Sequence, residues 1–200
     1  ADYEALLRDS TEEAEALLRD LLINVTRFFR DPGAWETLAE TVVRPLVDDI
    51  ATGQEVRAWV PGCATGEEAY TLAILLFEAA DAAGKDIALK VFATDPAHRA
   101  LDFARAGLYP HAIAEQVGPG RLSAFFTRED EGYRVGRRLR EALVFAPHNV
   151  LADPPFSRMN VVSCRNLLIY LARPLQDRVV ALLHFSLLDG GSDRPVTTSR

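Results

Sequence analysis

Two glycines and two adjacent carboxylates mark the stretch of the chain best suited to chemistry. Residues 56–60 alternate with the two-residue period of a strand, and apolar residues at helical spacing follow Gly66. Gly62 and Gly66 let the backbone approach a ligand closely, because neither carries a side chain. Glu67 and Glu68 would repel a pyrophosphate at the start of this helix, where anions otherwise bind well. The pattern favours a nucleotide-type cofactor that lacks phosphates and is partly cationic, such as S-adenosylmethionine.

The same turn has two other interpretations. The dinucleotide fingerprint G-x-G-x-x-G is absent, since the glycines are spaced G-x-x-x-G, and this argues against a dehydrogenase. Thr65 and Glu68 have the spacing of a capping box, which predicts that a helix begins near Gly66. An ordinary turn between a strand and a helix, with capping acids, therefore stays an alternative to a cofactor loop.

Asp95 is the next candidate, at the end of a second apolar strand over residues 87–94. An acid at the carboxyl end of the strand that follows a glycine turn can accept hydrogen bonds from ribose hydroxyls. Pro96 follows it directly, so Asp95 is equally suited to cap the helix that we expect over residues 96–106. Both roles remain open at this point.

The elements that must position these residues follow from periodicity and from glycine and proline placement. We expect helices over residues 2–22, 33–51, 66–83 and 96–106, strands over 56–60, 87–94, 143–146 and 160–164, and a last helix from Pro174. Residues 107–142 break this rhythm and predict a small inserted subdomain, with an edge strand at 132–135. Residues 192–200 are polar and unpatterned, which would leave strand 160–164 an unpaired edge unless another segment covers it.

Composition limits the class of protein. Two hundred residues, 48% of them hydrophobic, predict one compact α/β domain. A net charge of −7 argues against nucleic-acid binding, and no apolar stretch is long enough to insert into a membrane. Two cysteines and four histidines without paired spacing predict neither a disulfide framework nor a metal site. We therefore expect a cytoplasmic protein.

Five ordered motifs resemble the chemotaxis receptor glutamate methyltransferases of the CheR type, especially the branch fused to methylesterase and PAS modules. They are Asn24–Arg30, Gly62–Tyr70, Ala93–Asp95, His148–Val150 and Cys164–Tyr170, and the similarity covers residues 20 to about 191. The resemblance implies a class I S-adenosylmethionine-dependent methyltransferase sheet (Rossmann-like, α/β) with a small antiparallel β-subdomain inserted at 107–142. Residues 1–23 would be a linker helix left from an N-terminal helical domain, and 24–191 the methyltransferase domain. Residues 192–200 would be a tail without the family's C-terminal strands.

The resemblance also implies a set of site residues. The cofactor-binding residues would be Asn24, Thr26, Arg30, Gly62, Glu67, Asp95, Asn149, Val150, Arg165 and Asn166, and the residues near the transferred methyl would be Tyr170 and Arg165. A guanidinium such as that of Arg30 can pair with the methionine carboxylate of the cofactor. Asn149 can offer a donor and an acceptor to adenine. Tyr170 could instead be a half-buried helix residue without a role in the reaction.

The implied reaction is methyl transfer to glutamate carboxylates in the cytoplasmic helices of chemoreceptors, a protein-glutamate O-methyltransferase activity. Two alternatives remain. The first is an adaptor of a sensory complex that binds the cofactor without turnover. The second is a methyltransferase acting on amines, which the segment Asp153–Phe156 suggests, although this segment precedes strand 160–164 instead of following it.

Overall fold

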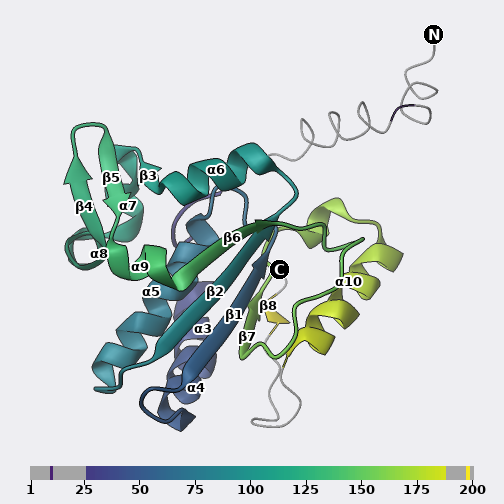
Figure 1. Ribbon diagram of the computed structural model, residues 1–200, viewed down its shortest axis with the longest axis horizontal. Helices are drawn as coiled ribbons and strands as arrows, with labels where there is room; N and C mark the ends of the chain where they lie inside the picture. The colour runs from purple at the N-terminus through teal and green to yellow at the C-terminus, as the bar shows by residue number, and fades with distance from the viewer. Residues whose placement is uncertain (1–9, 11–25, 188–196, 199–200) are drawn as a thin grey trace.

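A parallel sheet forms the centre of the protein (Figure 1). The computed structural model describes residue 10, residues 26–187 and residues 197–198; the helix expected over residues 2–22 therefore lies outside the described residues. The strands are β1 (Glu55–Pro61), β2 (Ala88–Asp95), β6 (Leu143–Pro147), β7 (Val161–Ser163) and β8 (Thr197–Thr198). Their order is β6-β2-β1-β7-β8, and every neighbouring pair is parallel.

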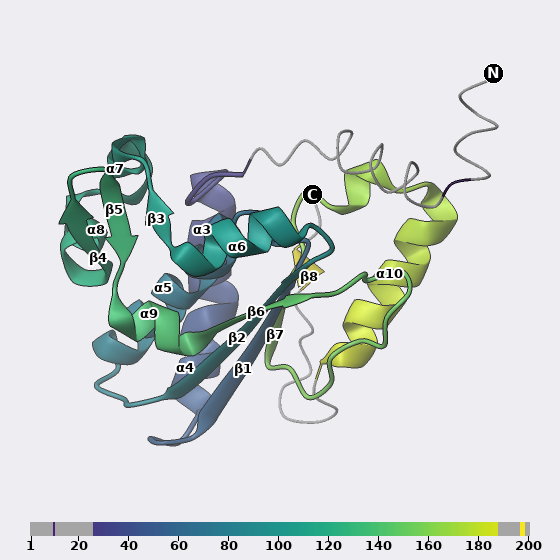
Figure 2. The ribbon, with the colours of Figure 1, turned by 45° about the horizontal axis from the view of Figure 1, so that its top comes forward.

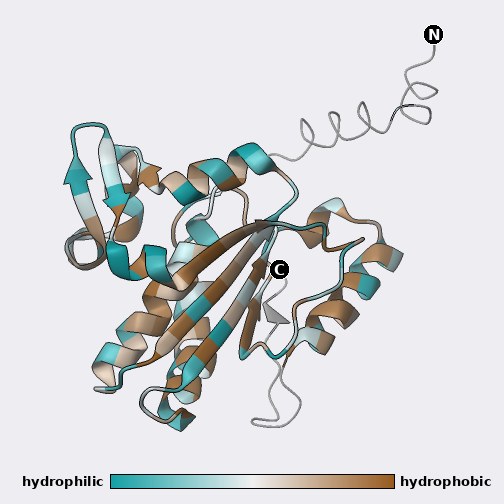
Figure 3. Ribbon diagram, viewed as in Figure 1, coloured by the Kyte–Doolittle hydropathy of each residue, from teal (hydrophilic) through white to brown (hydrophobic). Residues whose placement is uncertain are grey.

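Helices cover both faces of this sheet (Figure 2). On one face lie α3 (Pro32–Leu38), α4 (Arg44–Asp49), α5 (Glu67–Ala82) and α6 (His98–Ala106), and α10 (Arg173–Ser186) lies on the other. The alternation predicted for residues 56–60 creates both cores: Val56, Ala58 and Val60 pack in the cluster with α5, whereas Trp59 packs with α10. The hydrophobic strands stand out in Figure 3. The predicted Rossmann-like α/β fold is confirmed, and its helices and sheet form three layers.

A π-helical segment interrupts the helix expected over residues 33–51. The helix runs from Pro32 to Asp49, but residues Ala39–Val43 (η1) have the wider π-helical hydrogen bonding. Pro45, just after this segment, has no backbone N–H to donate into a regular helical ladder. Within this segment the Arg44 N–H donates to the carbonyl oxygen of Ala39, five residues earlier, which is the π-helical spacing.

The inserted β-subdomain forms its own small sheet. Between α6 and β6 the chain forms β3 (Leu108–Tyr109), η2 (His111–Ile113), α7 (Ala114–Val117), α8 (Pro119–Phe125), β4 (Phe126–Glu129), β5 (Gly132–Val135) and α9 (Arg137–Ala142). The antiparallel order is β3-β5-β4, so β5 is the central strand, and the edge position expected for residues 132–135 is wrong. A Cβ on Gly132 would lie 2.0 Å from the backbone oxygen of Tyr109, so only glycine allows β3 to pair this closely.

The far edge of the main sheet is covered. Strand β8 pairs with β7 through Val162–Thr197 and Ser163–Thr198, and Met159 bridges to Leu187. Strand β7 is therefore not an unpaired edge, because Thr197–Thr198 covers it, which is the alternative that the sequence had left open. A short polar strand gives too little periodicity to be found from sequence.

Candidate active site

A cavity of about 210 Å³ opens at the carboxyl ends of β1, β2, β6 and β7, where open parallel sheets bind their ligands. Five chain segments that are far apart in the sequence form its wall. The lining residues are Thr26, Arg27, Arg30, Trp35, Gly62, Cys63, Ala64, Glu68, Asp95, Pro96, His148, Asn149, Val150, Leu151, Arg165, Asn166, Leu167, Tyr170 and Leu171.

Most of the site residues inferred from sequence meet in this cavity. Thr26, Arg30, Gly62, Asp95, Asn149, Val150, Arg165, Asn166 and Tyr170 all line it. Among the described residues, Glu67 is placed outside the lining, and its neighbour Glu68 takes that position. Asn24 lies outside the described residues. The individual cofactor contacts of all these residues stay predictions.

Asp95 holds two backbone segments together at the wall of the cavity. Its Oδ2 accepts a hydrogen bond from the Ala64 N–H (2.9 Å) and its Oδ1 accepts one from the Ala97 N–H (2.8 Å). Asp95 thus ties the loop after β1 to the segment that leads into α6, whose N-cap residue is Ala97, and its contact with a ribose stays a prediction. Burial raises the pKa of Asp95 above its ordinary value, and the two N–H donors oppose that rise. Each carboxylate oxygen keeps a lone pair for a ligand hydroxyl.

The two carboxylates at the start of α5 point in different directions. Gly66, with φ of 94°, occupies the N-cap position, and the Thr65 hydroxyl donates to Glu67 Oε2 (2.7 Å). Glu68 instead accepts a hydrogen bond from the Ser163 hydroxyl on β7 (2.7 Å). The predicted capping box between Thr65 and Glu68 is therefore wrong.

Glu68 is a functional candidate that the sequence reasoning noted as a carboxylate at the helix start but left out of the cofactor-binding set in favour of Glu67. Burial raises its pKa to about 7, while the Ser163 hydrogen bond and the charge of Arg165 act in the opposite direction. A carboxylate with this pKa in the wall of a cavity marks a candidate ligand-binding group. Besides the position of Glu68 after the glycine turn, a further signal in the sequence was Ser163, a small polar residue in an otherwise apolar strand.

Arg165 fixes the segment that precedes α3. Its Nη1 donates to the Arg30 carbonyl oxygen (2.6 Å), and its Nη2 pairs with Asp31 Oδ2 (2.9 Å). Its guanidinium carbon lies 5.0 Å from the centre of the Trp35 ring. Arg165 is almost fully buried. These contacts hold Arg30 beside the cavity and leave Arg165 little freedom to move.

A tight loop after β6 presents Asn149 to the cavity. The Asn149 side-chain oxygen accepts from the Leu151 N–H (3.0 Å), and the Asn149 N–H donates to Asp153 Oδ2 (2.7 Å). The Asn149 side-chain NH₂ therefore remains as the natural donor toward a ligand. His148 Nε2 lies 3.0 Å from the Pro154 carbonyl oxygen, while its buried Nδ1 has no partner in the described part of the protein.

Backbone strain gathers in the same loops. Five non-glycine residues have positive φ in the described ranges, and four of them, Phe29, Asp31, Ala64 and Asn166, belong to the segments that form the cavity wall. Such conformations cost about 1–3 kcal/mol each and persist only where the surrounding structure holds them. Their concentration at this cavity supports its assignment as the functional site.

Tyr170 lies at the mouth of the cavity, at the end of η3 (Leu168–Tyr170), and is 47% exposed. Next to it in sequence, Ile169 is 63% exposed, an unusual exposure for an isoleucine. Arg27 and Arg30 also line this cavity, although the chain as a whole is acidic. The lining therefore combines these two arginines with two carboxylates, Glu68 and Asp95.

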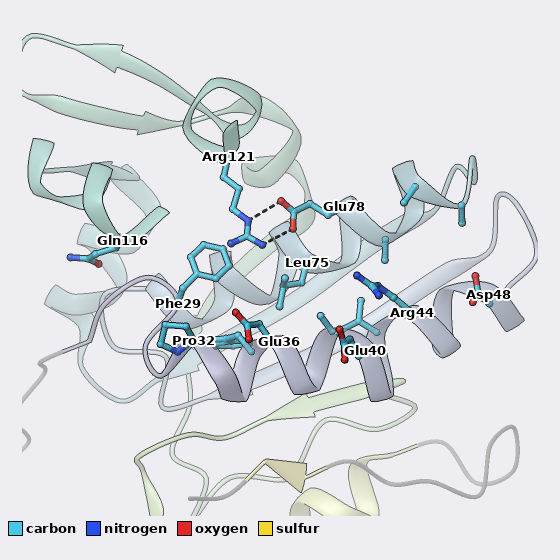
Figure 4. Close-up of a pocket in the computed structure, with 16 residues that line it drawn as sticks. Phe29, Pro32, Glu36, Glu40, Arg44, Asp48, Leu75, Glu78, Gln116 and Arg121 are labelled. Carbon is cyan, nitrogen blue, oxygen red and sulfur yellow. Dashed lines mark hydrogen bonds and ion pairs between the residues drawn. The ribbon is translucent and has the colours of Figure 1, made fainter. Parts of the chain in front are cut away.

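A larger cavity of about 490 Å³ lies away from these strand ends, between α3–α4, α5 and the insertion (Figure 4). Its floor contains Leu75 and Ala79, and its rim carries Glu36 and Glu40. It contains none of the predicted site residues, so size alone does not identify the reactive centre.

The donor set of the smaller cavity fits S-adenosylmethionine better than a phosphate-bearing cofactor. Carboxylates at Glu68 and Asp95 suit the cationic and hydroxyl groups of that molecule, and the free amide of Asn149 suits its adenine. Among the described residues, no group of three or more His, Cys, Asp or Glu side chains could hold a metal ion. The described helices include none that is long and apolar enough to cross a membrane.

Comparison with known proteins shows the family of this chain. Residues 24–192 match the family described as CheR methyltransferase, SAM binding domain. The chain is 46% identical over 188 residues to an uncharacterized 104.1 kDa protein in the hypE 3'region of Rhodobacter capsulatus, covering 94% of this chain and 20% of that protein. It is 33% identical over 193 residues to chemotaxis protein methyltransferase 2 of Pseudomonas aeruginosa, covering 92% and 67%.

Among solved structures, an S-adenosylmethionine dependent methyltransferase from Mesorhizobium loti aligns over 76% of this chain and 52% of its own, with a TM-score of 0.39 and 15% identity. The chain spans only a fifth of its Rhodobacter relative, so the activity of a whole protein is a separate question. The match over residues 24–192 decides the family. The chain belongs to the CheR methyltransferases, and its cofactor is S-adenosylmethionine.

Proposed function

We propose that this chain transfers the methyl group of S-adenosylmethionine to glutamate side chains of chemoreceptors, as a protein-glutamate O-methyltransferase. One observation carries the proposal: residues from motifs more than a hundred positions apart line one cavity at the carboxyl ends of the strands. Relatives named chemotaxis protein methyltransferase support the choice of acceptor. The cofactor supplies an electrophilic methyl group on a sulfonium sulfur.

Cofactor binding would use the wall of the cavity. Asp95 would accept hydrogen bonds from the ribose, because each of its oxygens keeps a lone pair after pairing with the backbone. Asn149 would donate to adenine from its free amide. Arg30 would pair with the methionine carboxylate, and Glu68 would face the positive charge of the cofactor.

The acceptor would enter at the mouth, beside Tyr170. A glutamate side chain with a pKa of about 4.3 is ionised at pH 7, so its attack on the methyl carbon needs no general base. Catalysis would then depend on alignment of carboxylate, methyl and sulfur, and on removal of water from the carboxylate. Arg27 and Arg30 line the cavity and would favour an anionic acceptor, and the exposed Ile169 would contact the apolar side of its helix.

The proposed acceptor also determines the compartment and the partners with which the chain would act. Chemoreceptor helices that carry such glutamates lie in the cytoplasm, so the chain would act there without entering a membrane or binding nucleic acid. The 104.1 kDa relative is about five times longer than its matching region, which supports a parent chain with further modules, such as methylesterase or PAS modules.

The segment Asp153–Phe156 gives little support to an amine acceptor. Asp153 accepts from the Asn149 N–H, and the Pro154 carbonyl oxygen faces His148. The ring of Phe156 packs 5.3 Å from Trp59 and 5.1 Å from Phe92, measured between ring centres. The Asp153 carboxylate, the Pro154 carbonyl oxygen and the Phe156 ring are thus engaged within the fold, in a segment that follows β6 and not β7.

The proposal is tested by incubating the chain with S-adenosylmethionine, labelled in the methyl group, and a cytoplasmic chemoreceptor fragment. Glutamate methyl esters hydrolyse in mild alkali, so the expected label is alkali-labile and depends on the receptor glutamates. A fragment with these glutamates changed to alanine is the matched control. Alkali-stable label would indicate an amine acceptor. Binding of S-adenosylhomocysteine without transfer of label to the receptor would indicate the adaptor role instead.

A further inference from the structure

The inserted subdomain contacts the loop after β1 through a buried tyrosine. Tyr109 on β3 donates a hydrogen bond from its hydroxyl to the Thr65 carbonyl oxygen, with an O–O distance of 2.6 Å. Tyr109 is 1% exposed. Thr65 follows directly on Gly62, Cys63 and Ala64, which line the cofactor cavity. This contact gives the loop a second anchor, in addition to the hydrogen bond from the Ala64 N–H to Asp95.

The insertion also contacts the segment that carries Thr26 and Arg30. Gln116 on α7 accepts a hydrogen bond from the Phe28 N–H through its Oε1 (3.0 Å). The Phe28 ring packs edge-on against Tyr109 and Phe126, with ring centres 4.9 and 5.6 Å apart. Phe28 therefore links Tyr109 and Gln116 of the insertion to the segment between Thr26 and Arg30.

A third contact comes from α8 (Figure 4). The Arg121 guanidinium lies 4.0 Å from the centre of the Phe29 ring and forms a two-fold hydrogen-bonded pair with Glu78 of α5, at 2.8 and 2.9 Å. Phe29 has φ of 49°, a conformation that a bulky residue adopts only under restraint. The insertion thus stabilises a strained residue directly beside Arg30.

We propose that the insertion, residues 107–142, positions the cofactor-binding loops, with Tyr109 and Gln116 as the positioning residues. The inference rests on the proposed cofactor site. Two strained residues, Phe29 and Ala64, lie in the two loops that the insertion holds. Without these hydrogen bonds the loops sample more conformations, and a ligand must order them when it binds. The effect appears as weaker cofactor affinity.

Tyr109→Phe tests the first contact, and Tyr70→Phe is its matched control. Tyr70 is also 1% exposed, and its hydroxyl donates to the Ala104 carbonyl oxygen of α6 (2.9 Å), away from the cavity. Each variant removes one buried hydroxyl and leaves one carbonyl oxygen without its partner. We expect Tyr109→Phe to raise the Kd for S-adenosylhomocysteine, measured by calorimetry, about five- to tenfold. Tyr70→Phe should change this Kd less than about twofold. Urea unfolding should show a similar loss of stability in both variants.

Gln116 gives a second test with little risk to folding, because its side chain is exposed. Gln116→Leu removes the acceptor for the Phe28 N–H, whereas Gln116→Glu keeps an oxygen in place. We expect Gln116→Leu to weaken S-adenosylhomocysteine binding about threefold and Gln116→Glu to restore it.

Equal Kd values for Tyr109→Phe and Tyr70→Phe, or equal effects of the two Gln116 substitutions, would overturn the positioning role while leaving the cofactor site intact. Failure of the wild-type chain to bind S-adenosylhomocysteine would instead overturn the proposed cofactor site, and the positioning role with it.

Discussion

Glu68→Gln should change how the stability of this protein depends on pH. Glu68 is only partly accessible at the wall of the cavity, and burial raises its pKa from 4.5 to about 7. The folded state therefore keeps this proton at pH values where the unfolded chain has lost it. Its contribution to stability is fully present below pH 4.5 and is lost as the pH rises through about 7.

The size of this effect follows from the two pKa values. A pKa difference between 4.5 and about 7 corresponds to about 2–3 kcal/mol of unfolding free energy, allowing for the partial exposure of the side chain. Glutamine cannot ionise, but its side-chain oxygen can still accept from the Ser163 hydroxyl. We expect Glu68→Gln to match the wild type at pH 4.5 and to be more stable by about 2 kcal/mol at pH 8.

Urea unfolding of both proteins at pH 4.5, 6 and 8 measures this difference. Glu36→Gln, an exposed carboxylate on α3, is the control and should stay within about 0.5 kcal/mol of the wild type at each pH. Proton release on cofactor binding is a second readout. The cationic cofactor should lower the pKa of Glu68, so binding near pH 7 should release a proton from the wild type and none from Glu68→Gln. Calorimetric titrations with the cofactor in two buffers of different ionisation enthalpy detect this proton. The reasoning would be refuted if the unfolding free energies of wild type and Glu68→Gln changed with pH in parallel.

Three further substitutions separate binding, transfer and folding. Asp95→Asn should weaken S-adenosylhomocysteine binding at least about tenfold by calorimetry, because an amide cannot accept from both the Ala64 and Ala97 N–H groups. Tyr170→Phe should keep its Kd and lie within about 0.5 kcal/mol of wild-type stability, but show slower methyl transfer in the labelled receptor assay. Gly132→Ala should destabilise the protein by about 2 kcal/mol or more in urea, since its Cβ would lie 2.0 Å from a backbone oxygen.

The main elements of the site could be predicted because their signals are local. The alternating apolar residues over 56–60 and the glycine turn after them can be recognised within a window of a few positions, and Asp95 ends a clearly apolar strand. The structure confirms that these segments adjoin at one edge of a parallel sheet. Strand order is harder to infer, because it depends on pairing between segments that are far apart in the sequence.

The errors arose where long-range contacts decide the outcome. Glu68 has the spacing of a capping residue, yet it bonds to Ser163, which is 95 positions away. Residues 132–135 could not be recognised as a central strand, because the partner strand β3 has only two residues. Arg165 lines the cavity as expected, but the sequence did not indicate that two of its donors pair with the Arg30 carbonyl oxygen and with Asp31, more than 130 positions away. No pattern within a short window contains these pairings.

The crystal structure of the chain with S-adenosylhomocysteine tests the central claim most directly. The account predicts that the ligand occupies the cavity at the carboxyl ends of β1, β2 and β6, with its ribose on Asp95 and its adenine on Asn149. Ligand density in the larger cavity between α3–α4 and α5, or a ribose that does not contact Asp95, would contradict it.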